Sequence, residues 1–195
     1  MGTPPLHADP DHHGVVEMIP GVPPASRLGK LALSGRTPEE LAFVAGQHLS
    51  WYREEHFIRL LLPSIPDLED IFLAALTIGS PGLPISADVK RRVTPIARAI
   101  EPILDPAAID RLRGHFLRFV EDGGRTNLQR WAIAAEATSL RAGFLLAGDL
   151  ATAERMMELE RAPEVRARMD DLLVFATSDR YAKLRRQLGI AVEAT

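Results

Sequence analysis

The chain has 195 residues and a mass of 21.4 kDa, enough for one domain with a buried core. Hydrophobic residues make up 46% and charged residues 25%, which excludes a disordered tail, a collagen-like fibre and a disulfide scaffold. The net charge of −3 gives no support to nucleic-acid binding, and the absence of cysteine excludes disulfides, thiolate metal sites and a cysteine nucleophile.

Targeting and membrane signals are missing from the sequence. The N-terminal residues lack the basic start and apolar run of a signal peptide. The most apolar stretch, residues 71–79, is too short to cross a bilayer. We therefore expect a soluble, cytoplasmic protein with no membrane span and no nucleic-acid partner.

The N-terminal residues are rich in proline, which fixes φ and removes a backbone donor. We therefore predict a flexible arm over residues 1–26, followed by a single helical domain over residues 27–195. A short strand is predicted at residues 28–33, before the turn at Ser34-Gly35. The prolines of the arm are Pro4, Pro5, Pro10, Pro20, Pro23 and Pro24.

From Thr37 onward the sequence predicts helices. Thr37, Pro38 and Glu40 form a capping box with proline at the first helical position, which predicts a helix over residues 38–61. The next helices are predicted at residues 66–79 and 86–103, the second of them kinked or broken at Pro95.

The remaining helices follow the same signals. Asp105-Pro106 predicts a helix start, and Gly123-Gly124 and Gly148 predict helix ends. Apolar residues recur at helical rather than alternating spacing, so we predict a mainly α fold with at most a small strand remnant near the N-terminus. The predicted ranges are 106–122, 127–147, 150–161, 163–177 and 179–188.

The first predicted helix carries an ordered set of residues, which consists of Glu40-Leu41, Val44, Gln47-His48-Leu49-Ser50-Trp51, Arg53 and His56. In its frame this set resembles the zinc-binding helix of gluzincin-type metallopeptidases, the group of the CAAX prenyl proteases and the bacterial heat-shock membrane peptidase. In that motif Gln47 and Trp51 stand at the two zinc histidines, and His48 stands at the general-base glutamate.

A second segment resembles the helix that supplies the third zinc ligand in those peptidases. It keeps Glu136, Arg141 and Gly143, but Leu140 replaces the family's aspartate. Residues 145–149 also resemble the family. The order and frame of the two segments carry the resemblance together.

The departures from the family point to a site without metal. Glutamine is a poor zinc ligand, and the indole of Trp51 is only a donor. The family aspartate supports a ligating histidine, and without that histidine a leucine at position 140 is tolerated. We therefore expect no catalytic residue, no metal and no cofactor, and we treat Gln47, His48, Trp51, Glu136 and Leu140 as degenerate-site positions.

Three functions remain open at this point. The first is a catalytically inactive metallopeptidase-like domain with a structural or protein-interaction role, acting with a protein partner or inside a larger multidomain protein. In this interpretation Glu136 contacts His48 or Gln47, and the N-terminal sheet typical of the family is truncated. The second is an enzyme in which a His48/Glu136 pair performs acid–base work and raises the pKa of the histidine. The third is an α-helical adaptor unrelated to peptidases.

Overall fold

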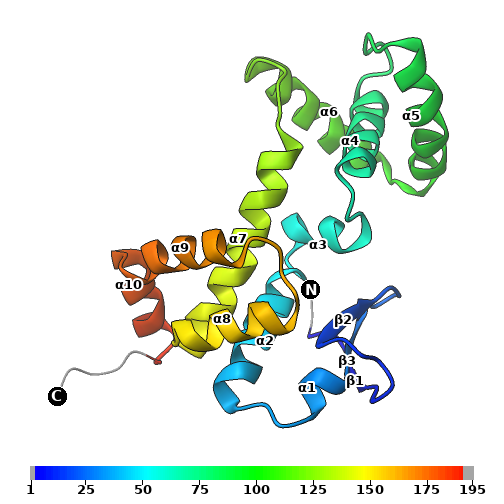
Figure 1. Ribbon diagram of the computed structural model, residues 1–195. Helices are drawn as coiled ribbons and strands as arrows, with labels where there is room; N and C mark the ends of the chain where they lie inside the picture. Colours follow the sequence, from blue (N-terminus) through cyan, green and yellow to red (C-terminus); the bar gives the residue numbers. More distant parts are fainter. Residues whose placement is uncertain (1–2, 191–195) are drawn as a thin grey trace. The chain divides into compact units, whose positions relative to one another are not determined.

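A computed structural model describes residues 3–190 of the chain (Figure 1). Within these residues there are ten α-helices, one 3-10 helix and three short strands, which confirms the mainly α fold. The chain divides into two compact units. Residues 62–132 form one, called here the inserted unit, and the residues before and after it form the other, called here the cleft unit. The single domain predicted over residues 27–195 therefore spans parts of both units.

The proline-rich N-terminal residues form a three-stranded sheet. Its strands are β1 (Leu6–Ala8), β2 (Val16–Ile19) and β3 (Ala25–Leu28). The strand order is β1-β3-β2, with β1 parallel and β2 antiparallel to β3, so β2 is an edge strand. The predicted flexible arm over residues 1–26 is therefore wrong. All six prolines lie before, between or after the strands, where they remove no ladder hydrogen bond.

The strand predicted at residues 28–33 is also wrong beyond its first residue. Leu28 ends β3, and residues 30–33 form the single-turn helix α1 (Lys30–Leu33). The backbone N–H of Lys30 donates to the carbonyl of His12 at 2.7 Å, and that of Gly29 donates to Val15 at 2.9 Å. These bonds to the loop before β2 turn the chain out of the sheet.

The predicted helix over residues 38–61 begins as expected but is interrupted. The capping box is present: Thr37 Oγ1 accepts from the Glu40 N–H at 3.2 Å, and the Glu40 carboxylate accepts from the Thr37 N–H at 3.1 Å. Two helices then follow, α2 (Pro38–Ser50) and α3 (Glu54–Leu61). The break positions the buried Tyr52, whose hydroxyl donates to the strand β3 carbonyl of Ala25 at 2.9 Å.

Helix α2 crosses α7 (Leu128–Ala147) at a contact between glycines. A Cβ placed on Gly46 would lie 2.5 Å from the Ala142 carbonyl oxygen, and one on Gly143 would lie 2.7 Å from that of Phe43. The two backbones therefore meet without intervening side chains, a geometry that only glycine permits here. This crossing brings together the two segments that resemble the peptidase motifs in sequence.

Three further helices complete the cleft unit: α8 (Leu150–Leu159), α9 (Val165–Ala176) and α10 (Asp179–Gln187). They match the predicted ranges to within two residues at each end. The ring of Phe144 stacks on that of Tyr181, with centroids 4.9 Å apart. The innermost core residues come from both sides of the inserted unit and are Phe43, Val44, Leu140, Phe144, Met156, Met157 and Leu172.

The inserted unit consists of α4 (Ile65–Gly79), α5 (Ala87–Ile100), the 3-10 turn η1 (Glu101–Ile103) and α6 (Pro106–Glu121). Helix α4 packs against both α5 and α6. The side chains of Ser64, Ser86 and Asp105 cap the three α-helices. Of the predicted kink or break at Pro95, the break does not occur, because helix α5 continues through Pro95 to Ile100.

The N-terminus of α8 depends on Asp149. Its carboxylate accepts from the Thr152 N–H at 2.8 Å and from the Thr152 hydroxyl at 2.6 Å, and these bonds lower the pKa of Asp149. We expect Asp149→Ala to lower the free energy of unfolding by about 1 kcal/mol at pH 7, measured by urea denaturation. Because the pKa of Asp149 is lowered in the folded state, the stability difference between the wild type and Asp149→Ala is expected to shrink as the pH falls through that folded pKa. Asp149→Asn, which keeps an acceptor, is the control, and equal losses for both variants would contradict this role.

None of the helices in the described part of the chain combines the length and apolar character that a membrane span requires.

Candidate functional site

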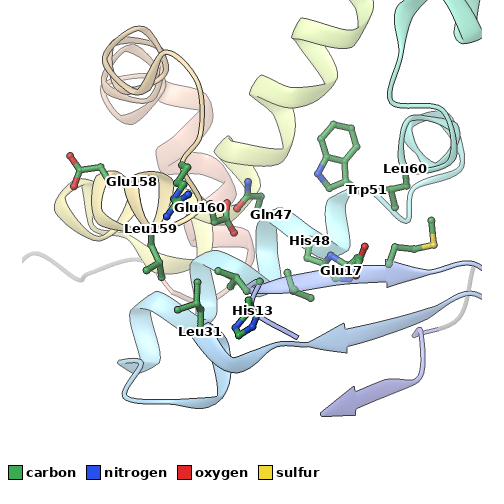
Figure 2. A pocket seen from close by; sticks show the side chains of 15 residues that line it. His13, Glu17, Leu31, Gln47, His48, Trp51, Leu60, Glu158, Leu159 and Glu160 are labelled. Atoms are coloured by element: carbon green, nitrogen blue, oxygen red, sulfur yellow. The ribbon is translucent and has the colours of Figure 1, made fainter. Parts of the chain in front are cut away.

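A cleft of about 990 Å³ opens in the cleft unit (Figure 2). One wall is formed by residues 13–18, which include the start of the edge strand β2, and another by residues 158–161 at the end of α8. Helix α2 contributes Gln47, His48 and Trp51. Three of the five degenerate-site positions therefore line one cleft.

Polar and apolar side chains both line the cleft along its length. Figure 2 shows Gln47 and Glu160 together near the middle, Trp51 and Leu60 toward one end, and Leu31 and Leu159 toward the other. A few polar groups among apolar side chains are common in binding sites, where they orient the bound molecule.

His48 is held by a chain of hydrogen bonds that ends in strand β3. Its Nε2 lies 2.7 Å from the hydroxyl oxygen of Ser26, which in turn lies 2.9 Å from the hydroxyl oxygen of Tyr52. The Tyr52 hydroxyl donates to the Ala25 carbonyl at 2.9 Å. Ser26 is only 1% exposed, so its hydroxyl cannot reach a substrate and does not act as a nucleophile beside His48.

Burial lowers the pKa of His48 to about 4, because the charged imidazolium is poorly solvated there. The His48 side chain is therefore neutral at physiological pH. The predicted pairing with Glu136, which would raise this pKa, does not occur.

Glu136 is bound elsewhere. One carboxylate oxygen accepts from Arg59 of α3 at 3.1 Å, and the other accepts from Arg168 of α9 at 3.3 Å. Among residues 3–190, no hydrogen bond joins Glu136 to His48 or Gln47. The predicted contact is wrong because two guanidinium groups, distant in sequence, satisfy the carboxylate instead.

Leu140 lies in the core rather than at the cleft and is 3% exposed. Trp51 lies at the cleft, where its ring meets the ring of His56 edge to face at 6.1 Å.

Glu160 is a cleft residue that the sequence analysis missed. Burial raises its pKa, while a hydrogen bond from the Gln47 side chain and the positive charge of Arg168 act in the opposite direction. A carboxylate at the end of a helix carries no sequence signal of burial, so only the fold reveals its position. Ser26 and Tyr52 were missed for the same reason.

Within the described residues, no cluster of three or more histidine, aspartate and glutamate side chains has the arrangement of a metal site. No family model, curated protein or solved structure matches the chain.

Proposed function

We propose that the chain is a catalytically inactive metallopeptidase-like domain, and that its cleft binds an extended segment of a partner protein. We further propose that it acts in the cytoplasm as part of a larger multidomain assembly. The observation that carries the proposal is the cleft itself, which runs beside an edge strand and is lined by Gln47, His48 and Trp51, the positions that resemble the catalytic motif of the gluzincin-type peptidases.

The edge strand supports the choice of an extended segment. Among the described strands β2 pairs only with β3, so the backbone groups on its other side are free of strand partners. An extended segment can pair with such an edge, and its alternate side chains then enter neighbouring pockets. The apolar residues Leu31 and Leu60 at the two ends of the cleft are suited to receive such side chains.

The chemistry of α2 supports the absence of catalysis. Gln47, His48 and Trp51 offer one neutral amide, one neutral imidazole and one indole, which cannot hold a zinc ion with the strength of two histidines and a carboxylate. Arginine side chains already neutralise Glu136, the remaining candidate ligand.

Substitutions of two adjacent leucines in α3, one that lines the cleft and one that does not, test this proposal. A library of displayed random octapeptides is selected on the wild-type protein, and enriched peptides are synthesised with blocked ends for titration. We expect Leu60→Glu, which places a charge inside the cleft, to weaken binding at least about tenfold. Leu61→Glu is the control, because Leu61 is 47% exposed and does not line the cleft; we expect its affinity to stay within about twofold of the wild type.

The failure of any peptide to enrich, or equal weakening by the two variants, would contradict the cleft as the binding site. Stoichiometric zinc in the purified wild-type protein, measured by mass spectrometry, would contradict the absence of a metal centre.

A further inference from the structure

The hydrogen-bond chain from strand β3 to His48 fixes where each hydrogen lies. The Ala25 carbonyl can only accept, so the hydroxyl hydrogen of Tyr52 is used there. The contact between Tyr52 and Ser26 must then use the hydrogen of Ser26. No hydrogen remains for the contact between Ser26 and His48 except one on Nε2. The neutral imidazole therefore carries its proton on Nε2, and Nδ1 carries a lone pair.

The lone pair on Nδ1 has no partner among residues 3–190. In this part of the chain His48 forms no hydrogen bond through Nδ1. The fully buried side-chain atoms without a partner do not include this nitrogen, so it is accessible from outside the protein interior. The side chain as a whole is only 8% exposed and lines the cleft. His48 thus directs a hydrogen-bond acceptor, held on a rigid scaffold, at whatever occupies the cleft.

The neighbouring polar groups are acceptors as well. Gln47 lies close enough to Glu160 to lower its pKa, and the carbonyl oxygen of the Gln47 side chain is an acceptor. The centre of the cleft therefore offers an imidazole nitrogen, an amide oxygen and a carboxylate, all of which accept hydrogen bonds.

The charges around the cleft favour a cation. Its lining residues include three carboxylates, Glu17, Glu158 and Glu160, against one guanidinium, that of Arg161. Glu17 is paired with Arg27, and Arg168 lies close enough to Glu160 to act on it electrostatically. Burial raises the pKa of Glu160, and Gln47 and Arg168 act against this effect.

We propose that the centre of the cleft binds a primary ammonium group, and that this group is the side chain of a lysine in the bound segment. An ammonium has three donors and no acceptor, which matches His48 Nδ1, the Gln47 carbonyl oxygen and the Glu160 carboxylate. Trp51 also lines the cleft. This inference rests on the proposed binding of an extended segment and adds the chemistry that selects it.

The test starts from the enriched octapeptides. We expect them to share a lysine at one position. Replacing that lysine by norleucine or by acetyl-lysine, which remove the charge, is expected to weaken binding about tenfold or more. The N-terminal amine of a peptide is the other possible source of an ammonium group. It is tested with a peptide that has a free N-terminal amine and norleucine at the lysine position. Recovery of binding by this peptide would overturn the assignment to a lysine side chain.

Variants of the protein test the role of each acceptor. Glu160→Gln is expected to remove most of the preference for lysine over norleucine, whereas Glu154→Gln, which neutralises an exposed carboxylate of α8 that does not line the cleft, is expected to keep it. Tyr52→Phe releases the Ser26 hydrogen, which can then be donated to His48 Nε2. We expect the Nδ1–H tautomer to become populated in this variant and the lysine preference to fall about threefold or more.

Nitrogen-15 NMR of the histidine rings reads the tautomer directly and does not depend on any peptide. The wild-type protein is expected to show a protonated Nε2 and a bare Nδ1 at His48; a protonated Nδ1 would overturn the inference. Equal binding of the lysine and norleucine peptides would also overturn it while leaving the proposed function intact. If no peptide binds at all, the proposed function fails and this inference fails with it.

Discussion

Gly46→Ala is expected to destabilise the cleft unit by about 3 kcal/mol, although alanine is the better helix former. The new Cβ would lie 2.5 Å from the Ala142 carbonyl oxygen and 2.9 Å from its carbon, and both are backbone atoms of α7 that cannot rotate away. The two helices must therefore separate, which opens the packing around Phe43 and Leu140. Overpacking of this kind costs more than the roughly 1 kcal/mol that alanine gains over glycine inside a helix.

Gly114→Ala is the matched control for this substitution. Gly114 lies inside helix α6, and a Cβ there would meet no atom within 4 Å. We expect this variant to be more stable than the wild type by up to about 1 kcal/mol. Urea denaturation followed by circular dichroism and tryptophan fluorescence compares the two. A Gly46→Ala protein as stable as the wild type would show that α2 and α7 do not meet at this glycine.

The second large effect is the pH dependence contributed by His48. Its folded pKa of about 4 lies below the unfolded value of 6.5, so between these values the unfolded chain binds the proton and the folded chain does not. The contribution of His48 to stability is therefore complete above pH 6.5 and falls by up to about 3 kcal/mol as the pH drops to 4.

Comparison with His48→Gln isolates this contribution. Glutamine does not titrate and can still donate to Ser26, so we expect the stability advantage of the wild type at pH 7 to shrink, or to reverse, near pH 4. Glu160 acts in the opposite direction, because its raised pKa means that the folded chain gains the proton first. This effect is common to both proteins and cancels in their difference. A difference that stays constant from pH 7 to pH 4 would contradict the burial of a neutral His48.

The helices of the inserted unit could be predicted because residues close in sequence determine where each helix begins and ends. Ser64, Ser86 and Asp105 each accept a hydrogen bond from the backbone N–H three residues later, as caps do wherever they occur. The two-residue stop at Gly123-Gly124 likewise depends only on backbone conformations with positive φ that glycine tolerates.

The sheet and the helix break could not be predicted because they depend on distant partners. Strands of three and four residues between prolines show no alternation long enough to detect. The break after Ser50 contains neither proline nor glycine. It is specified by the bond between Tyr52 and Ala25, which are 27 residues apart.

Part of the candidate site could likewise be predicted from the sequence, and part of it could not. The i, i+4 spacing of Gln47 and Trp51 on one helix could be read directly, and both residues do line the cleft. The partner of Glu136 could not be read, because Arg59 and Arg168 come from helices 77 residues before it and 32 residues after it. The pattern of a single sequence shows which residues share one face of a helix. It does not show which side chains of distant segments contact that face.

The division of the chain into two units also determines the order in which it can fold during synthesis. The core of the cleft unit joins Phe43 and Val44 to Met156 and Leu172, which the ribosome adds more than 100 residues later. The first 61 residues therefore leave the ribosome with their apolar faces uncovered. The inserted unit is continuous in sequence and can complete its own contacts earlier. The nascent cleft unit thus exposes the edge strand β2 and the apolar face of α2 for as long as the inserted unit takes to be made.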